Sequence, residues 1–228
     1  MNKPAGQEQE AVKEQKPLTD GQKAAYSIGF LKGREAGALF EMDMDLAISG
    51  FTAGMKGETP LFEEGEIQAT LATLQKRLQE NQKNEINSIA EKNKQVALDF
   101  LKENGQHADI VTTSSGVQYR ILHKSDKKQK PKLTDQVKVH YELTLPASFT
   151  EELKGRLIDS SVKRGEPAVF GLGQVIPGWS EIVQLMSVGE KWECFIPPAL
   201  GYGVAGNQGI PPNQLLRFEI ELLEIIKG

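Results

Sequence analysis

The chain has 228 residues and a mass of 25.1 kDa, enough for one large domain or two modest ones. Hydrophobic residues make up 39% and charged residues 25%, which allows a buried core and excludes a disordered or fibrous protein. The net charge is −4, the pI is about 5.6, and no Lys/Arg cluster is dense enough to follow a phosphate backbone, which argues against nucleic-acid binding. No apolar run approaches the roughly 20 residues that span a bilayer, so no transmembrane segment is predicted.

The cysteine and histidine content does not support a metal or disulfide site. Cys194 is the only cysteine, so the chain cannot form an internal disulfide or a thiolate metal site. His107, His123 and His140 do not show the spacing of metal ligands. We therefore expect neither a metal nor another cofactor.

The N-terminal part of the chain is predicted to be helical after a flexible tail. Residues 1–18 are rich in Gln, Glu and Lys and nearly lack apolar side chains, which is typical of a mobile segment. Thr19 and Asp20 favour the start of one helix, and Asp43 or Asp45 the start of a second. Both helices carry glycines four residues apart, which let another backbone approach closely: Gly29, Gly33, Gly37, Gly50 and Gly54. A helix crossing within the chain and one between two chains are equally compatible with this pattern.

A single long helix is predicted over about residues 63–104, at the end of the helical region 19–111. Two apolar stripes lie along it: Ile67, Leu71, Leu74 and Leu78, then Ile86, Ile89, Val96 and Phe100. We expect the first stripe to pack with the N-terminal helices and the second near the following domain. Residues 79–85 between them are polar on every side, which is typical of a helix that crosses solvent. A coiled coil is the alternative, but the heptad pattern fails at Asn81 and Glu85.

The C-terminal part, residues 112–228, is predicted to consist mainly of strands. Residues 137–143 and 216–222 alternate between apolar and polar side chains, and residues 117–122 and 191–196 are further candidates. Pro177 favours the start of a short helix that Gly189 ends, with one apolar face formed by Trp179, Ile182, Val183 and Met186. The pattern predicts an antiparallel sheet packed against a helix, so the whole chain is assigned to the α+β class.

Familiar catalytic motifs fail on inspection. Residues 201–206 match the G-x-G-x-x-G nucleotide-binding pattern, but Pro211 and Pro212 follow too soon for the helix that this motif requires. Cys194 is expected to be a buried core thiol rather than a nucleophile, and His140 an exposed or hydrogen-bonded residue on the polar face of its strand. What remains is a concentration of aromatic and aliphatic residues in loops around the short helix, which indicates an apolar binding site.

Five ordered motifs in residues 112–228 resemble the FKBP-type peptidyl-prolyl cis/trans isomerases: Val139-His140-Tyr141, Asp159-Ser160-Ser161, Val175-Ile176-Pro177-Gly178-Trp179, Leu200-Gly201-Tyr202-Gly203 and Gly209-Ile210-Pro211-Pro212-Asn213. The helical region, including Ala24-Ala25-Tyr26-Ser27-Ile28-Gly29, is similar to the N-terminal dimerisation domain of the Mip and FkpA subgroup of bacterial envelope isomerases. The resemblance implies an all-helical dimerisation domain, a long connecting helix and a twisted antiparallel sheet half-wrapped around a short helix.

The resemblance also implies a set of site residues. Tyr141, Asp159 and Tyr202 would be catalytic. The implied substrate-binding residues are Ile158, Phe170, Val175, Ile176, Trp179, Ile210 and Phe218. Trp179 would form the floor on which a proline ring rests, while the Ile176 amide and the Tyr202 hydroxyl would bind substrate carbonyls. Ile158 stands where the family usually has Phe, and residues 146–156 look like an insertion at the pocket's edge.

The implied function is isomerisation of X–Pro bonds in unfolded or partly folded polypeptides, without a nucleophile or a covalent intermediate. The alternative from another class is a dimeric holdase-type chaperone that binds unfolded clients and keeps only a weak isomerase pocket. The resemblance implies a homodimer through residues 19–80 and macrolide inhibitors of the family as ligands. It favours the bacterial periplasm or the outer membrane as location, whereas the absence of an apolar signal core favours the cytoplasm. We expect the cell envelope, with the cytoplasm as the alternative.

Overall fold

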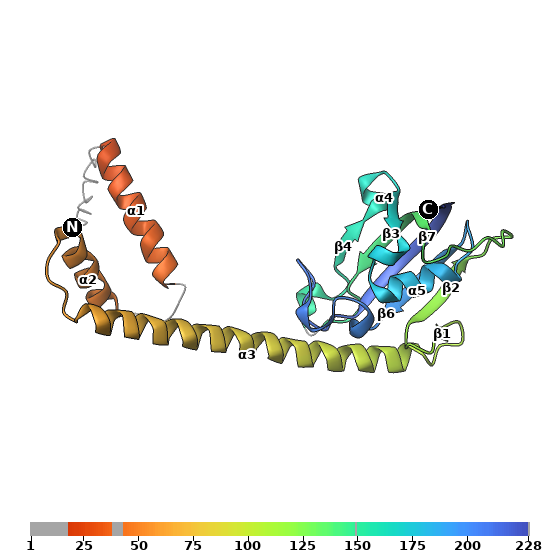
Figure 1. Cartoon of the computed structure of the whole chain (residues 1–228), viewed down its shortest axis with the longest axis horizontal. Coiled ribbons are helices and arrows are strands. Elements are labelled where there is room, and N and C mark those ends of the chain that lie inside the picture. Colours follow the sequence, from red (N-terminus) through yellow and green to blue (C-terminus); the bar gives the residue numbers. More distant parts are fainter. Residues whose placement is uncertain (1–17, 38–42, 149, 228) are drawn as a thin grey trace, which may run out of the picture. The chain divides into compact units, whose positions relative to one another are not determined.

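Figure 1 shows the computed structural model of the chain, which describes residues 18–37, 43–148 and 150–227. The chain divides into two compact units, the first ending at Leu78 and the second beginning at Gln79. One long helix therefore contributes to both units. None of the helices that are described combines the length and the hydrophobicity that crossing a membrane requires.

The described part of the first unit is helical, as predicted. Its elements are α1 (Asp20–Gly37), α2 (Met44–Lys56) and the first part of α3 (Glu64–Asn104). The Thr19 hydroxyl accepts a hydrogen bond from the Gln22 amide (3.3 Å), and the Asp43 carboxylate accepts one from the Leu46 amide (3.0 Å). Both predicted helix starts are therefore confirmed. The predicted tail, residues 1–18, lies outside the described residues apart from its last residue.

Neither α1 nor α2 buries any of its described residues, so the apolar side chains of both helices are at least partly exposed. A groove of about 560 Å³ runs between them and is lined by residues that include Gly29, Gly33, Gly37, Ala47, Ile48 and Phe51. A Cβ built at any of the five spaced glycines would meet no described atom within 4 Å. The described residues therefore do not form a helix crossing within the chain at these glycines.

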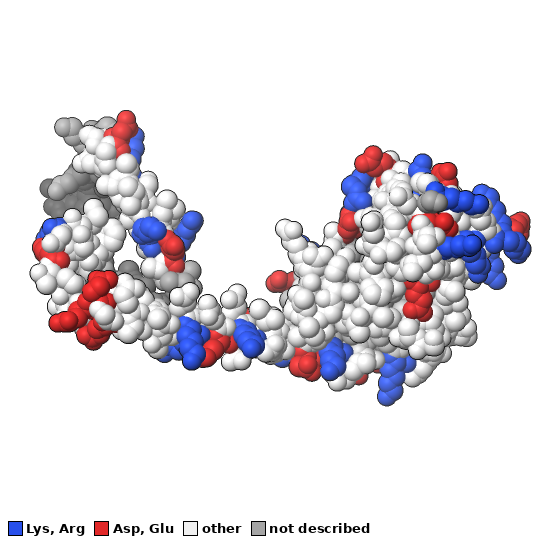
Figure 2. All heavy atoms as spheres, viewed as in Figure 1, with Lys and Arg blue, Asp and Glu red and all other residues white. Residues whose placement is uncertain are grey.

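Helix α3 spans 41 residues and starts within one residue of the predicted position. Residues 79–85 are exposed all round, which confirms the predicted polar turn. Basic and acidic side chains alternate along the middle of this helix in Figure 2. A helix segment of this kind is held by its own hydrogen bonds and by contacts at its ends, not by burial.

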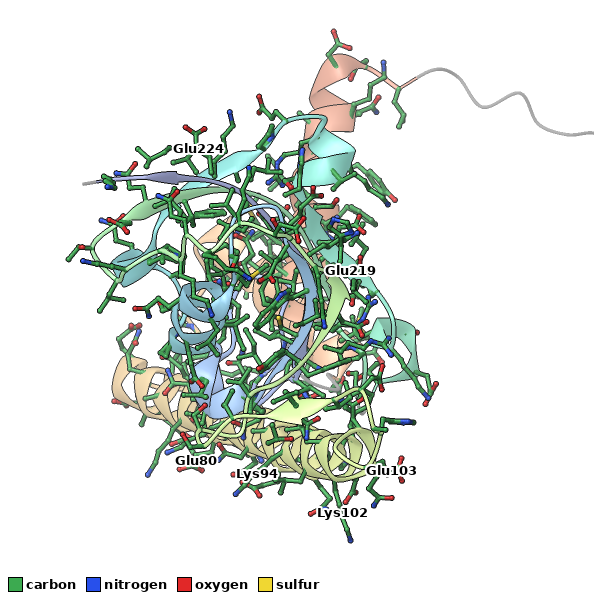
Figure 3. The ribbon with its side chains drawn as sticks, turned by 90° about the vertical axis from the view of Figure 1, so that its right-hand side faces the viewer. Glu80, Lys94, Lys102, Glu103, Glu219 and Glu224 are labelled. Atoms are coloured by element: carbon green, nitrogen blue, oxygen red, sulfur yellow. The ribbon has the colours of Figure 1, made fainter. Side chains whose placement is uncertain are left out.

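The second apolar stripe predicted on α3 is confirmed in part, because Val96 and Phe100 pack against the small core cluster of Ala97, Ala147 and Leu215. The fully buried residues of this half of the helix are different ones. Its buried residues are Ala90, Asn93 and Ala97, whereas Ile86 is 44% exposed. Hydrogen bonds hold this side of the helix close to the backbone of residues 212 and 213. The polar side faces away from the sheet in Figure 3, where the labelled residues include Lys94, Lys102 and Glu103.

Seven antiparallel strands form one sheet in the second unit. They are β1 (Val111–Thr112), β2 (Gln118–His123), β3 (Gln136–Thr144), β4 (Leu157–Ser160), β5 (Ala168–Gly171), β6 (Lys191–Ile196) and β7 (Leu216–Ile226). Their order in space is β1-β2-β6-β7-β3-β4, and β5 also pairs with β3. Buried and half-buried residues alternate along β3 and the first part of β7, which confirms the predicted period of two.

Short elements connect the strands. They are the four-residue helix α4 (Ser161–Arg164) and four 3₁₀ turns, η1 (Glu151–Leu153), η2 (Leu172–Gln174), η3 (Pro198–Leu200) and η4 (Gly203–Ala205). The segment that resembles an insertion is tied to the domain, because the Leu145 amide donates to Arg156 O (3.1 Å) and the Gly155 amide to Leu145 O (2.6 Å). It is therefore closed at its base by backbone hydrogen bonds.

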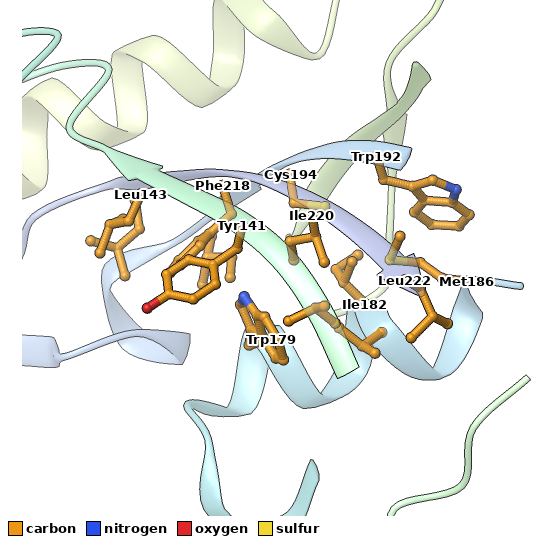
Figure 4. Packing of buried hydrophobic residues seen from close by; sticks show 14 of the residues in the cluster. Tyr141, Leu143, Trp179, Ile182, Met186, Trp192, Cys194, Phe218, Ile220 and Leu222 are labelled. Atoms are coloured by element: carbon orange, nitrogen blue, oxygen red, sulfur yellow. The ribbon is translucent and has the colours of Figure 1, made fainter. Parts of the chain in front are cut away.

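Helix α5 (Pro177–Leu185) packs its apolar face on the sheet, and Figure 4 shows Trp179, Ile182 and Met186 facing the strands. The predicted helix end at Gly189 is wrong, because α5 ends at Leu185. The amides of Val188 and Gly189 donate instead to the carbonyls of Gln129 (3.1 Å) and Leu222 (2.7 Å). Because these amides bond to distant carbonyls and not to carbonyls of α5, the helix ends before Gly189.

Gly178 in the first turn of α5 should tolerate no side chain. A Cβ there would overlap Cγ2 of Ile196 and lie 3.3 Å from the Leu200 Cβ. We expect Gly178→Ala to lower the free energy of unfolding by about 1–3 kcal/mol, measured by denaturant titration, because the core must shift. Gly173→Ala is the matched control, since the nearest atom to its Cβ would lie at 3.7 Å. Equal unfolding midpoints for the two variants would contradict the close packing.

Candidate active site

A mostly apolar cavity of about 370 Å³ opens in the second unit beside α5. It is lined by Tyr141, Leu143, Asp159, Phe170, Gln174, Val175, Ile176, Trp179, Tyr202 and Phe218. Half of these residues are aromatic, and Asp159 is the only carboxylate among them. A cavity with this lining suits an apolar ring that makes a few polar contacts at its edges.

Strand register brings the aromatic rings together around Trp179. Leu143 of β3 pairs with Phe218 of β7, and Tyr141 lies two residues before Leu143 on the same strand. The rings of Tyr141 and Phe218 therefore point to the same face of the sheet. Trp179 is only 3% exposed, and its ring lies 5.5 Å from that of Phe170 and 6.3 Å from that of Phe218 in edge-to-face geometry. Figure 4 shows Tyr141 and Phe218 extending from their strands toward Trp179. The edge-to-face contacts fix the orientation of the indole.

Asp159 is held at the cavity by two donors. The Tyr141 hydroxyl and the Arg164 guanidinium both donate to its carboxylate, and Arg164 also donates to the Tyr141 hydroxyl (3.1 Å). Burial raises the pKa of Asp159, but the hydrogen bonds from Tyr141 and Arg164 outweigh burial and hold the pKa below its ordinary value. Burial, followed by the hydrogen bond to Asp159, raises the pKa of Tyr141. At neutral pH the carboxylate is therefore ionised and the phenol is protonated.

The segment before α5 presents a backbone donor. Ile176 O accepts hydrogen bonds from the amides of Trp179 (3.0 Å) and Ser180 (3.1 Å), and the Ser180 hydroxyl donates to Leu172 O (2.6 Å). These bonds fix the segment between η2 and α5. The amide of Ile176 donates to none of the described residues, which leaves it available to a bound molecule.

The cavity brings together eight of the ten predicted site residues and leaves out Ile158 and Ile210. Ile158 is half-buried and packs against the core cluster that contains Tyr141, Trp179 and Phe218. Ile210 is 5% exposed and belongs to the hydrophobic core.

Three residues of the site were not predicted from the sequence: Leu143, Gln174 and Arg164. Leu143 follows Tyr141 by two residues on a strand of period two, so its position was a usable signal. Arg164 follows Asp159 by five residues, and only the turn of α4 folds it back onto the carboxylate. Nothing in the local sequence indicates this contact.

The structure also tests the predictions for Cys194, His140 and residues 201–206, which were not expected to be catalytic or to bind a nucleotide. Cys194 is fully buried on β6, and burial, together with the charge of Glu193, raises the pKa of its thiol well above the ordinary value, so the predicted core role is confirmed. His140 lies with Nδ1 3.1 Å from the Ser161 hydroxyl, as predicted for a hydrogen-bonded residue. Residues 201–206 contain a 3₁₀ turn and do not open an α-helix, as the nucleotide-binding motif would require.

Two family models match successive parts of the chain. A domain amino terminal to FKBP-type peptidyl-prolyl isomerase matches residues 21–121, and the FKBP-type peptidyl-prolyl cis-trans isomerase model matches residues 127–223. The chain belongs to the FKBP-type peptidyl-prolyl cis-trans isomerases, and the cavity lies in its isomerase part.

Similar proteins cover most of the chain. The FKBP-type peptidyl-prolyl cis-trans isomerase FkpA of Aeromonas hydrophila is 39% identical over 214 residues, which are 90% of this chain and 76% of that protein. The outer membrane protein MIP of Legionella longbeachae is 36% identical over 212 residues, 92% of this chain and 88% of that protein. The crystal structure of FkpA from Escherichia coli matches with a TM-score of 0.73 and 31% identity, over 92% of this chain and 98% of that one. The expected α+β fold is thereby confirmed.

Replacing Asp159 by asparagine tests the importance of its charge. The Asp159→Asn amide keeps the shape but loses the charged acceptor, so we expect kcat/KM for a proline tetrapeptide to fall about tenfold, the order of one charge-assisted hydrogen bond. Asp126→Asn, on an exposed loop residue outside the cavity, is the control. Because the pKa of Asp159 is lowered, its carboxylate is charged at neutral pH. The contribution of this charge to the kcat/KM of the wild-type enzyme should therefore be lost only as the pH falls through the lowered pKa. An unchanged kcat/KM in Asp159→Asn would show that the charge of Asp159 is not important for activity.

Proposed function

We propose that the cavity holds the proline ring of an X–Pro segment in an unfolded or partly folded polypeptide and speeds rotation of the bond without a covalent intermediate. The observation that carries this proposal is the buried indole of Trp179, which is fixed edge-to-face by Phe170 and Phe218 and offers a rigid apolar surface. Tyr141, Asp159 and Tyr202 are assigned the catalytic role. The assigned substrate contacts are Phe170, Val175, Ile176, Trp179 and Phe218.

The required stabilisation is modest. Amide resonance sets a barrier of about 18–20 kcal/mol to rotation, and the twisted transition state has lost this conjugation. A dry aromatic site disfavours the more polar planar amide, so it lowers the barrier by favouring the twisted form. An acceleration of about 10⁴-fold corresponds to roughly 5.5 kcal/mol, which desolvation and a few oriented dipoles can supply.

The polar groups at the cavity have separate roles in this proposal. The free amide of Ile176 and the hydroxyl of Tyr202 donate to substrate carbonyls on either side of the rotating bond. Asp159 is ionised and already accepts from Tyr141 and Arg164, so it organises these groups and does not transfer a proton. Rotation about a single amide bond breaks and forms no covalent bond, which is why no nucleophile is needed.

Removing the Tyr202 hydroxyl tests the assigned hydrogen bond. We expect Tyr202→Phe to lower kcat/KM for a proline tetrapeptide by about two- to tenfold, the range of one neutral hydrogen bond. Tyr119→Phe is the matched control, because Tyr119 stacks on Trp192 at 4.4 Å and does not line the cavity.

The same kinetics in D₂O separate this mechanism from proton transfer. A rate ratio near unity is expected for the wild-type enzyme, and a large solvent isotope effect would argue for a proton in flight and against the proposal.

We further propose that the chain forms a homodimer through residues 19–80. The exposed apolar residues of α1 and α2 include Tyr26, Phe30, Met44, Ile48 and Phe51, each at least 50% exposed. Monomeric proteins rarely leave large contiguous apolar patches in water, and the open glycine ridge allows a second helix to approach closely. A second copy of the chain brings the same surfaces, so two copies can cover each other.

A charge in the groove should separate the two copies. We expect Phe51→Asp to shift the mass measured by light scattering at micromolar concentration from that of a dimer to that of a monomer, while activity on a short peptide is retained. Leu98→Asp is the control, because Leu98 is 55% exposed on α3 but lies outside the groove. A monomeric wild-type chain would refute the dimer.

A cell-envelope location and a holdase-type chaperone activity complete the proposal. The first is supported by similarity to a relative named outer membrane protein MIP. The second is supported by the apolar surfaces of α1 and α2, which could hold an unfolded client in addition to a partner copy. Cell fractionation tests the location. Suppression of aggregation of a proline-free client, which cannot use isomerisation, tests the chaperone activity.

A further inference from the structure

We propose that the C-terminal half of α3 positions Tyr202, so that Asn93 and Asn213 are positioning residues of the isomerase site. The inference rests on the proposed substrate role of Tyr202. It concerns a helix that contributes no residue to the lining of the cavity. All the contacts involved lie within the second unit, which begins at Gln79.

Two side-chain hydrogen bonds link α3 to the loop that follows Tyr202. The Asn93 amide donates from α3 to Pro212 O at 3.0 Å, and the Asn213 amide donates back to Ala90 O on α3 at 3.1 Å. Asn93 is 3% exposed and Asn213 is 7% exposed, so water does not compete well for either bond. One bond runs from α3 to the loop and the other from the loop to α3, so together they fix the distance between the helix and the loop.

The loop transmits this position to Tyr202 through its backbone. The Asn213 amide N–H donates to Gly203 O at 2.8 Å, one residue after Tyr202. Asn207 and Ile210 exchange both backbone hydrogen bonds at 2.9 Å, which closes the tip of the loop. At Gly206 even a Cβ would overlap Ile210 O, so the two arms of the loop are in close contact. A shift of Asn213 is therefore expected to move Tyr202 with it.

Asparagine suits position 213 for a backbone reason as well. Asn213 is the only non-glycine residue with a positive φ in the described chain, at 50°. Asparagine tolerates this left-handed conformation better than most residues. Its side chain and its backbone amide can thus bind α3 and Gly203 at the same time.

Helix α3 can serve as a fixed reference because other contacts anchor its end to the sheet. Phe100 packs on Phe195 of β6 with ring centroids 5.4 Å apart. The Gln118 side chain of β2 donates to Leu101 O and accepts from the Asn104 amide, both at 2.8 Å. The helix is therefore joined to the sheet at one place and to the Tyr202 loop at another.

Two variants and a matched control test the proposal in the full-length chain. Asn93→Ala removes one donor, and Asn213→Asp removes the other while keeping a residue that tolerates a positive φ. Asn87→Ala changes the same residue type on an exposed position of the same helix. Labelling with 3-fluorotyrosine gives each of the four tyrosines a ¹⁹F signal, and the Tyr202 signal is assigned from its loss in Tyr202→Phe.

We expect Asn93→Ala and Asn213→Asp to shift or broaden the Tyr202 signal, leave the Tyr119 signal unchanged, and lower kcat/KM by about three- to tenfold. This is below the roughly 100-fold that a misplacement of about 1 Å can cost. Asn87→Ala should change neither signal nor rate. An unchanged Tyr202 signal in both variants, with folded protein confirmed by the Tyr119 signal, would overturn the proposal. Failure of the substrate role of Tyr202 is recognised separately, because Tyr202→Phe would then retain full activity.

Discussion

The burial of one indole ring between a helix and a sheet is the interaction on which the isomerase unit depends. Trp179 belongs to the hydrophobic core and also lines the cavity, so one set of aromatic contacts serves both stability and binding. The rings around it come from β3, β5 and β7, which are distant in sequence. A cavity built in this way is rigid because moving any wall would also disturb the core.

Features that depend on local periodicity could be predicted from the sequence, and features that depend on distant partners could not. The alternation of residues 137–143 predicts β3 and the common face of Tyr141 and Leu143. The end of α5 is set by carbonyls at residues 129 and 222, which local glycine and proline signals do not reveal. The hydrogen bonds between α3 and residues 212 and 213 were missed for the same reason, because Asn93 and Pro212 are 119 residues apart. For the site, the motifs located eight lining residues but not Arg164, whose contact requires the turn of α4.

Helix α3 combines two chemically different environments in one element. Its C-terminal half packs on the sheet and on a proline-rich loop, whereas residues 79–85 are all exposed. Backbone hydrogen bonds within the helix do not depend on burial, so the helix can continue through an exposed segment. An element with this construction can belong to two units without requiring them to share a core.

The burial of Cys194 makes the native chain chemically unreactive toward thiol reagents. The thiol is fully buried and its raised pKa keeps it protonated at neutral pH, so neither alkylating agents nor disulfide exchange should reach it in the folded protein. A cysteine introduced at an exposed position, such as Asn81 on the polar turn of α3, would then be the only accessible thiol among the described residues. The wild-type sequence is thus a ready background for attaching a single spin label or fluorophore to either unit.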